Sequence, residues 1–140
     1  MSLIVFRIVL LLGGAFVVLT GLNNSLGGLN TMGWLGISDF YQVTNMEMFK
    51  IRDNHVRFIG GVWTALGAFL CLAATNPLKY RQRIYLVCAA IFVAGFARFT
   101  SGDFVTVFGP DIIGSLAAEL IGMPILAFWL NRLEGSSETR

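Results

Sequence analysis

With 140 residues, the chain has the length of one domain. It is 56% hydrophobic and only 13% charged, and its mean hydropathy is +0.73. Soluble domains contain about a quarter of charged residues, so this composition indicates a membrane protein. The net charge of +2 is too small to indicate a nucleic-acid partner, and no basic stripe with interleaved aromatic residues is present. We therefore expect an all-α integral membrane protein that forms a single domain over residues 1–140.

The first apolar run covers residues 3–22 and is broken only by Arg7. A helix of about 20 residues is long enough to cross the roughly 30 Å of bilayer hydrocarbon. A secretory signal is the alternative interpretation, but no lysine or arginine precedes the run and no A-x-A cleavage pattern follows it. We expect a retained first transmembrane helix.

A long connection is predicted for residues 23–53, because its glycines and asparagines disfavour regular structure. This segment is nevertheless rich in aromatic residues and methionines, which a polar linker would lack. We expect it to fold back on the helices or to lie among the lipid headgroups, where tryptophan and tyrosine are favoured. Long loops in compact proteins are often functional, but a simple interfacial cap is the alternative.

The second span is predicted at about residues 54–74, with a small and polar face at helical spacing. The residues of this face are Arg57, Gly60 or Gly61, Thr64, Gly67 or Ala68, and Cys71. Small faces in membranes point at other helices, because they let the backbones approach closely. Arg57 is therefore expected to point at the helix bundle rather than at lipid.

The third and fourth spans are predicted at about residues 84–101 and 112–130, and each carries one ionisable residue. Arg98 lies near the far end of the third span, and Glu119 lies seven residues into the fourth. Pro124 follows Glu119 by just over one turn, so a kink is expected there. A line of small residues is also present on the fourth span: Gly114, Ala118 and Gly122. The tail after residue 130 is polar and expected to be mobile.

The distribution of lysine and arginine predicts the topology. Positive residues are concentrated in the turn between spans two and three (Lys79, Arg81, Arg83) and in the C-terminal tail (Arg132, Arg140), whereas the long loop has Lys50 and Arg52 and the connection after span three has none. The positive-inside rule therefore places both termini in the cytoplasm of a multi-pass inner-membrane protein.

This topology places Arg57, Arg98 and Glu119 in the outer half of the membrane, with Asp53 and His55 at the same end. A carboxylate at that depth is costly, so Glu119 is expected to pair with an arginine or to be protonated. The five residues thus form a candidate polar cluster. It either holds the spans together or binds a ligand.

Metal and thiol chemistry find little support. Cys71 and Cys88 both lie inside apolar runs, without a disulfide framework or zinc-ligand spacing. A single histidine, His55, cannot build a metal or haem site alone. We expect no metal and no obligatory cofactor, although a bound lipid or quinone is possible.

Several of these features resemble a family of small bacterial four-helix membrane proteins built from a domain of unknown function, and more loosely the DoxX-like group. They are Arg57 with Gly60, Gly61 and Gly67, Arg98 followed by Ser101, and the acidic Glu119. The resemblance implies an inner-membrane four-helix bundle, and DoxX-like members are associated with quinol-oxidase systems and thiol stress. This chain departs from that layout in its long first loop, and it lacks a CxxC pair.

The sequence contains no GxSxG elbow, HExxH motif or P-loop, so we expect no enzyme. One hypothesis is a structural or accessory subunit of a membrane assembly, with membrane lipids, other subunits or a second copy as partners. The other is a binding or carrier protein for a small amphiphile, such as a quinone or a lipid. A channel is disfavoured, because no helix carries polar residues along its full depth.

Overall fold

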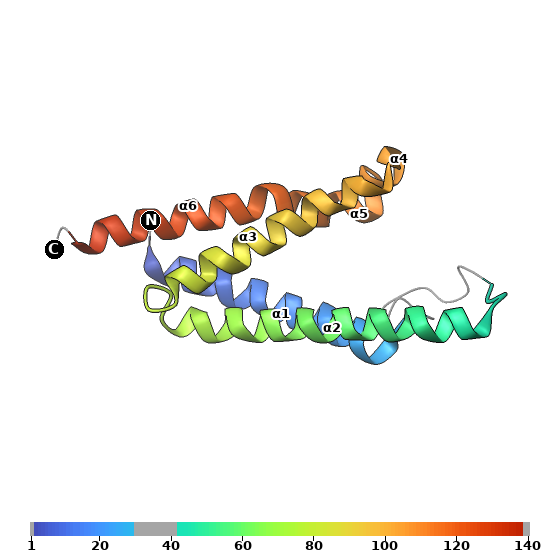
Figure 1. The fold of residues 1–140 in the computed structure, drawn as a ribbon. Helices are drawn as coiled ribbons and strands as arrows, with labels where there is room; N and C mark the ends of the chain where they lie inside the picture. Colours follow the sequence, from blue (N-terminus) through green and yellow to red (C-terminus); the bar gives the residue numbers. More distant parts are fainter. Residues whose placement is uncertain (1, 30–41, 139–140) are drawn as a thin grey trace. The chain divides into compact units, whose positions relative to one another are not determined.

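The computed structural model describes residues 2–29 and 42–138, with side chains described as far as residue 135 (Figure 1). Helices account for 87% of the described residues, which contain no strand. Four helices are long and apolar enough to cross a membrane: Leu3–Gly27, Met46–Thr75, Arg81–Ser101 and Pro110–Gly135. The predicted all-α fold with four membrane-length helices is confirmed. Helices are expected there, because hydrocarbon offers no water to the backbone and each span must satisfy its own N–H and C=O groups.

The helical elements follow one another as α1 (Leu3–Gly27), α2 (Met46–Thr75), α3 (Arg81–Ala97), the 3₁₀ turn η1 (Arg98–Ser101), α4 (Phe104–Val107), α5 (Pro110–Ala117), the π-helical turn η2 (Ala118–Gly122) and α6 (Met123–Glu138). Their contacts group into two compact units. One comprises Arg7–Thr75, and the other comprises Met1–Phe6 with Asn76–Arg140. The single domain expected from the sequence remains a prediction, and each unit is described by itself.

The first unit consists of α1 and α2, and both helices extend into the predicted loop. α1 continues to Gly27 and α2 begins at Met46, so only the middle of residues 23–53 is non-helical in the part described. The centre of that loop, residues 30–41, lies outside the described residues. The prediction of a loop over all of residues 23–53 was therefore wrong, and α2 begins eight residues before the predicted second span. Its 30 residues make α2 about 45 Å long, more than the hydrocarbon needs, so its polar first turns extend past it.

Glycines let α1 and α2 pack backbone to backbone in an antiparallel pair. A Cβ built on Gly14 would lie 2.9 Å from the carbonyl oxygen of Gly67, and one on Gly67 would lie 2.7 Å from that of Gly14. Gly21 and Gly60 repeat this reciprocal contact, at 2.9 and 2.8 Å. The two pairs are seven residues apart on both helices, so the same face returns after two turns. Only glycine allows such an approach, in which Cα–H groups can contact carbonyl oxygens.

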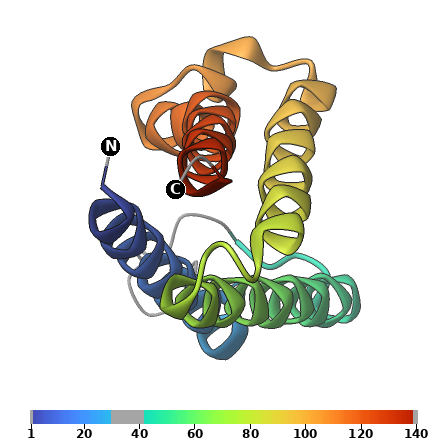
Figure 2. The same ribbon diagram turned by 90° about the vertical axis from the view of Figure 1, so that its left-hand side faces the viewer.

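The second unit is built around α3 and α6. The short helix α4 bridges the end of α3 to α5, as Figure 2 shows, and α5 leads through η2 into α6. Local capping explains this connection. Gly102 ends η1 in the left-handed conformation at φ 72°. Asp103 then caps α4 by accepting a hydrogen bond from the Thr106 backbone N–H at 3.1 Å, and Pro110 occupies the first turn of α5.

The helices of this unit also extend further than predicted. α3 begins at Arg81 rather than at residue 84, α5 at Pro110 rather than at residue 112, and α6 continues to Glu138 rather than ending near residue 130. The apolar runs mark the hydrocarbon-embedded part of each helix, whereas the hydrogen-bonded backbone continues into the polar flanks. The predicted end of the helix near residue 130 was therefore wrong, because residues 131–138 are helical, and the mobility expected of this segment remains a prediction.

The fourth span is irregular one turn earlier than the predicted kink. Residues Ala118–Gly122 form a π-helical turn, and Met123 donates its N–H to the Ala118 carbonyl, five residues back. Pro124 supplies the reason, because it lacks an N–H and its ring would clash with the carbonyl four residues before it. One extra residue in the turn relieves this clash, as π-bulges do.

Candidate functional site

Arg98 and Glu119 form a two-pronged ion pair between η1 and η2. Arg98 Nε donates to Glu119 Oε2 at 2.7 Å, and Nη2 donates to Oε1 at 2.6 Å. Glu119 is buried, with 8% of its surface exposed. Two parallel charge-assisted hydrogen bonds use both carboxylate oxygens, so the charge of Glu119 is neutralised within the unit.

The neighbouring helix makes room for the carboxylate with a glycine. A Cβ on Gly95 would lie 2.9 Å from Glu119 Cβ and 2.8 Å from Leu120 Cδ2. Gly95 thus lets α3 approach the π-helical turn closely enough for Arg98, three residues later, to reach Glu119. The ion pair therefore depends both on the close approach that Gly95 allows and on the side chain of Arg98.

The π-helical turn also leaves a backbone acceptor beside this pair without its usual helical donor. The N–H of Met123, four residues after Glu119, is given to Ala118, and residue 124 is a proline without an N–H. Neither position can therefore donate to the Glu119 carbonyl. π-Bulges of this kind are frequent at functional sites.

Arg57 caps the C-terminal end of α1 from α2. Its Nη1 donates to the carbonyl of Leu26 at 2.7 Å and to that of Ser25 at 3.3 Å, and its Nε meets Asp53 Oδ2 at 2.7 Å. Asp53 Oδ1 in turn accepts the backbone N–H of Leu29 at 2.7 Å, just after the helix ends. The last carbonyls of a helix have no partner inside it, so Arg57 satisfies acceptors at the end of α1, and Asp53 satisfies the backbone N–H that follows this end.

The chain turns at Gly28 to reach these groups. Gly28 has φ 69°, in the left-handed region, and a Cβ there would collide with Asp53 Oδ1 and with the Arg57 guanidinium. Glycine is needed at this position for both its backbone conformation and its lack of a side chain.

Within the two units, the structure pairs four of the five predicted site residues and leaves His55 outside both pairs. Arg98 lies with Glu119 in one unit, and Arg57 lies with Asp53 in the other. His55 is exposed on α2 and makes no hydrogen bond to a described residue. That Arg57 joins Arg98 and Glu119 in one cluster concerns both units and remains a prediction.

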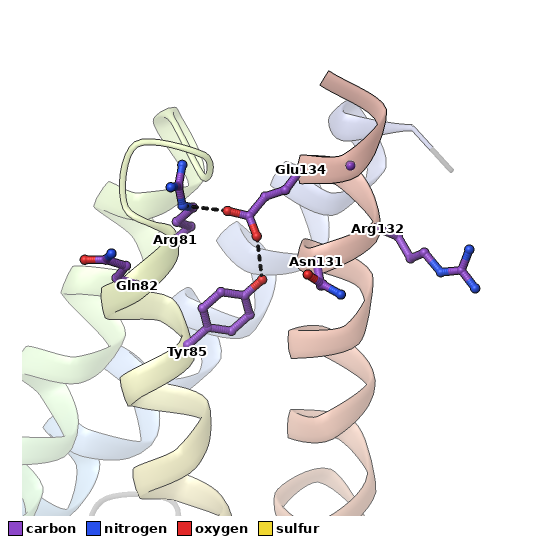
Figure 3. Close-up of a pocket in the computed structure, with 7 residues that line it drawn as sticks. Arg81, Gln82, Tyr85, Asn131, Arg132 and Glu134 are labelled. Atoms are coloured by element: carbon purple, nitrogen blue, oxygen red, sulfur yellow. Dashed lines mark hydrogen bonds and ion pairs between the residues drawn. The ribbon is translucent and has the colours of Figure 1, made fainter. Parts of the chain in front are cut away.

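A further polar network links the N-terminal end of α3 to the C-terminal end of α6, and it was not predicted from the sequence. Glu134 Oε1 meets Arg81 Nε at 2.6 Å, while its Oε2 accepts a hydrogen bond from the Tyr85 hydroxyl at 3.0 Å (Figure 3). The usable signal was Tyr85, a polar residue just inside the third span, opposite an acidic residue just beyond the fourth. It was overlooked because Glu134 was assigned to the tail.

The remaining candidate groups form no site of their own. Within the described ranges, no three or more His, Cys, Asp or Glu side chains gather as metal ligands would. Cys71 Sγ contacts the Leu11 carbonyl at 3.8 Å in the α1–α2 pair, and Cys88 is buried. The buried indole Nε1 of Trp129 has no acceptor in the part of the chain that is described.

Four membrane-length apolar helices, with ion pairs that join η1 to η2 and α3 to α6, define a small multi-pass helical membrane protein. The family model of a domain of unknown function, DUF4345, matches residues 5–130, and the chain belongs to this family. No curated protein and no solved structure matches the chain.

Proposed function

We propose that this protein is a structural or accessory subunit of a membrane assembly, without catalytic activity of its own. The observation that carries the proposal is the closed Arg98–Glu119 pair, in which one arginine engages both oxygens of a buried carboxylate. A group that binds or transforms a substrate must offer free donors or acceptors. Here Arg98 and Glu119 hydrogen-bond to each other, and this pair joins the end of α3 to the π-helical turn.

The second arginine supports the same proposal. The Arg57 guanidinium is engaged by Asp53 and by the last carbonyls of α1, and its bond to Leu26 is short. The cavities at residues 81–135, at residues 78–83 and at residues 29–52 of the described chain are not lined by Arg57, Arg98 or Glu119. The polar residues of the spans therefore act best as clamps that hold helices in register.

Exposed small and apolar residues are the surfaces that a partner would use. A Cβ on Gly13, Gly61 or Gly114 would meet no described atom within 4 Å, so a further helix could approach at these positions. We place the protein in the inner membrane with both termini in the cytoplasm, because lysine and arginine concentrate in residues 79–83 and in the C-terminal segment. The looser resemblance to the DoxX-like group is part of this proposal, resting on Arg57, Arg98 with Ser101, and Glu119.

Native mass spectrometry of the protein extracted gently from membranes tests the proposal. We expect it to emerge with other membrane subunits or with a second copy of itself. The Glu119→Gln variant should be less stable, yet retain the same partners whenever it folds. A wild-type protein that always emerges as a monomer, with a small molecule bound in stoichiometric amount, would contradict the subunit role.

The π-helical turn favours a second candidate function, the binding of a small amphiphile such as a quinone or a lipid. The Glu119 carbonyl is left without an N–H from residues 123 and 124, beside a charged pair that an amphiphile's polar end could contact. Organic extraction of the purified protein, followed by mass spectrometry, distinguishes the two. Loss of a specific extracted molecule from a folded Glu119→Gln protein would favour the carrier, and an unchanged extract would favour the clamp.

A further inference from the structure

A polar cavity lies where the N-terminal end of α3 meets the C-terminal end of α6. It has a volume of about 750 Å³ and is lined by Arg81, Gln82, Tyr85, Asn131, Arg132, Glu134 and Gly135. Figure 3 shows Glu134 reaching across it to Arg81 and Tyr85, whereas Arg132 projects from α6 away from this pair. The cavity belongs entirely to one unit and is far along the chain from the Arg98–Glu119 pair.

The charge of this end of the unit is strongly positive. Residues 79–83 and 131–135 carry four basic side chains, Lys79, Arg81, Arg83 and Arg132, against one acidic side chain, Glu134, which leaves an excess of three positive charges. Arg81 uses Nε to reach Glu134, so its two Nη groups still point to no described acceptor. The amides of Gln82 and Asn131 add neutral donors. Such a set of donors suits a phosphate group.

Exposed apolar side chains lie one turn further along both helices that line the cavity. Leu86 lies one turn after Gln82 on α3 and is 71% exposed, and Phe128 lies one turn before Arg132 on α6 and is 60% exposed. Arg132 lies over the Phe128 ring at 5.1 Å. A charged rim above exposed apolar side chains is the profile of a phospholipid, whose phosphate lies at the interface and whose acyl chains lie below it.

We propose that this cavity binds the phosphate-bearing headgroup of an anionic phospholipid. Arg81 supplies the main charge, Gln82 and Asn131 supply further hydrogen bonds, and the acyl chains extend along the exposed apolar side chains of the helices that line the cavity. Glu134 has two opposing effects on the affinity for the headgroup. It holds Arg81 in place, but its negative charge repels the phosphate. This proposal does not depend on the subunit role.

Native mass spectrometry of the full chain in detergent, at one fixed ionic strength, tests the proposal. Phosphatidylglycerol, phosphatidylcholine of the same acyl chains, and inorganic phosphate are each titrated into the protein. We expect phosphatidylglycerol to bind at least about fivefold more tightly than phosphatidylcholine, as one basic contact near a membrane surface would give. Equal binding of the two lipids would overturn the proposal, and so would inorganic phosphate displacing phosphatidylglycerol at equal concentration, which would indicate a site for a free anion.

Three variants locate the site. Arg81→Gln should weaken phosphatidylglycerol binding about fivefold. Arg83→Gln is the matched control, because it removes the same charge from the same turn but does not line this cavity. It should change binding less than about twofold. An equal loss in both variants would show a diffuse basic turn instead of the cavity.

Glu134→Gln makes the test independent of folding defects. It keeps a similar shape while removing the repelling charge, so phosphatidylglycerol should bind about threefold to fivefold more tightly. A damaged protein would not gain affinity in this way. Weaker or unchanged binding to the folded Glu134→Gln protein would refute the assignment of the headgroup to this cavity.

Discussion

Two adjacent glycines of α2 should respond in opposite ways to the same substitution. Gly60 faces α1, where a Cβ would meet the Ser25 backbone nitrogen, the Gly21 carbonyl oxygen at 2.8 Å and the Asn24 carbonyl carbon at 2.9 Å. Gly61 has nothing within 4 Å of the same position. All three atoms near Gly60 belong to the backbone, so no side chain can turn aside to accommodate the methyl group.

The difference between Gly60→Ala and Gly61→Ala isolates the cost of crowding. Both variants gain the same helix propensity, about 1 kcal/mol, so this contribution cancels between them. Overpacking a tight contact costs about 1–3 kcal/mol. Because the clashing atoms cannot move alone, we expect Gly60→Ala to have a free energy of unfolding about 2–3 kcal/mol below that of Gly61→Ala.

Reversible unfolding in mixed micelles, followed by circular dichroism, measures this difference. The reaction of Cys71 with a thiol reagent gives a second, local readout, because its sulfur packs against the Leu11 carbonyl in the same helix pair. It should react faster in Gly60→Ala and at the wild-type rate in Gly61→Ala. Gly14→Ala and Gly13→Ala provide the matched pair on α1, since only Gly14 faces α2.

Equal stabilities of Gly60→Ala and Gly61→Ala would refute the reciprocal glycine contacts between α1 and α2. A more stable Gly60→Ala protein would do so more strongly, because it would place this residue on an open face.

Three further predictions concern the polar residues. Arg57→Gln should lower the free energy of unfolding by about 1–3 kcal/mol, as loss of charge-assisted hydrogen bonds does, and hydrogen exchange should rise at the end of α1 but not at α6. Glu119→Leu should lower the free energy of unfolding by up to about 3–5 kcal/mol, because it leaves the charge of Arg98 unpaired. The Arg98→Met, Glu119→Leu double variant should recover most of this free energy. If it recovers none, the pair is not purely structural. The hydrogen bonds between Asp103 and Thr106 lower the pKa of the Asp103 carboxyl below the usual 3.8. The ionised carboxylate should therefore cap α4 fully above pH 3.8, and the cap should be lost as the pH falls through the lowered pKa. A carboxyl pKa at or above 3.8, measured by NMR, would contradict the cap.

The composition and the four apolar runs were enough to predict the all-α membrane fold, because hydrocarbon permits few other structures. The same runs could not give the helix ends. Arg57 donates a hydrogen bond to the carbonyl of Leu26 at the end of α1, and the two residues are 31 positions apart in the sequence. No local sequence pattern indicates such a contact. The polar first turns of α2 and last turns of α6 are helical because the ladder of backbone hydrogen bonds continues beyond the lipid.

The candidate site was likewise predicted only in part from the sequence. The cost of a buried carboxylate pointed to Glu119 and to an arginine partner, which is an argument from chemistry alone. The π-helical turn that carries Glu119 depends on how Pro124 is accommodated, and the predicted kink was one turn from the irregularity observed. The network of Glu134 with Arg81 and Tyr85 was not predicted, since Glu134 lies at least 49 residues along the chain from both partners and beyond the apolar run of the fourth span.

The sequence alone determined that one face of the second span is small and carries an arginine, so that this face meets another helix. It could not decide between the members of each double glycine, because Gly60 and Gly61, or Gly13 and Gly14, differ by only 100° around a helix. Tertiary packing decided it. Gly14 opposes Gly67 and Gly21 opposes Gly60, at distances that admit no side chain, and this register places Arg57 one turn further on, at the carbonyls that end α1.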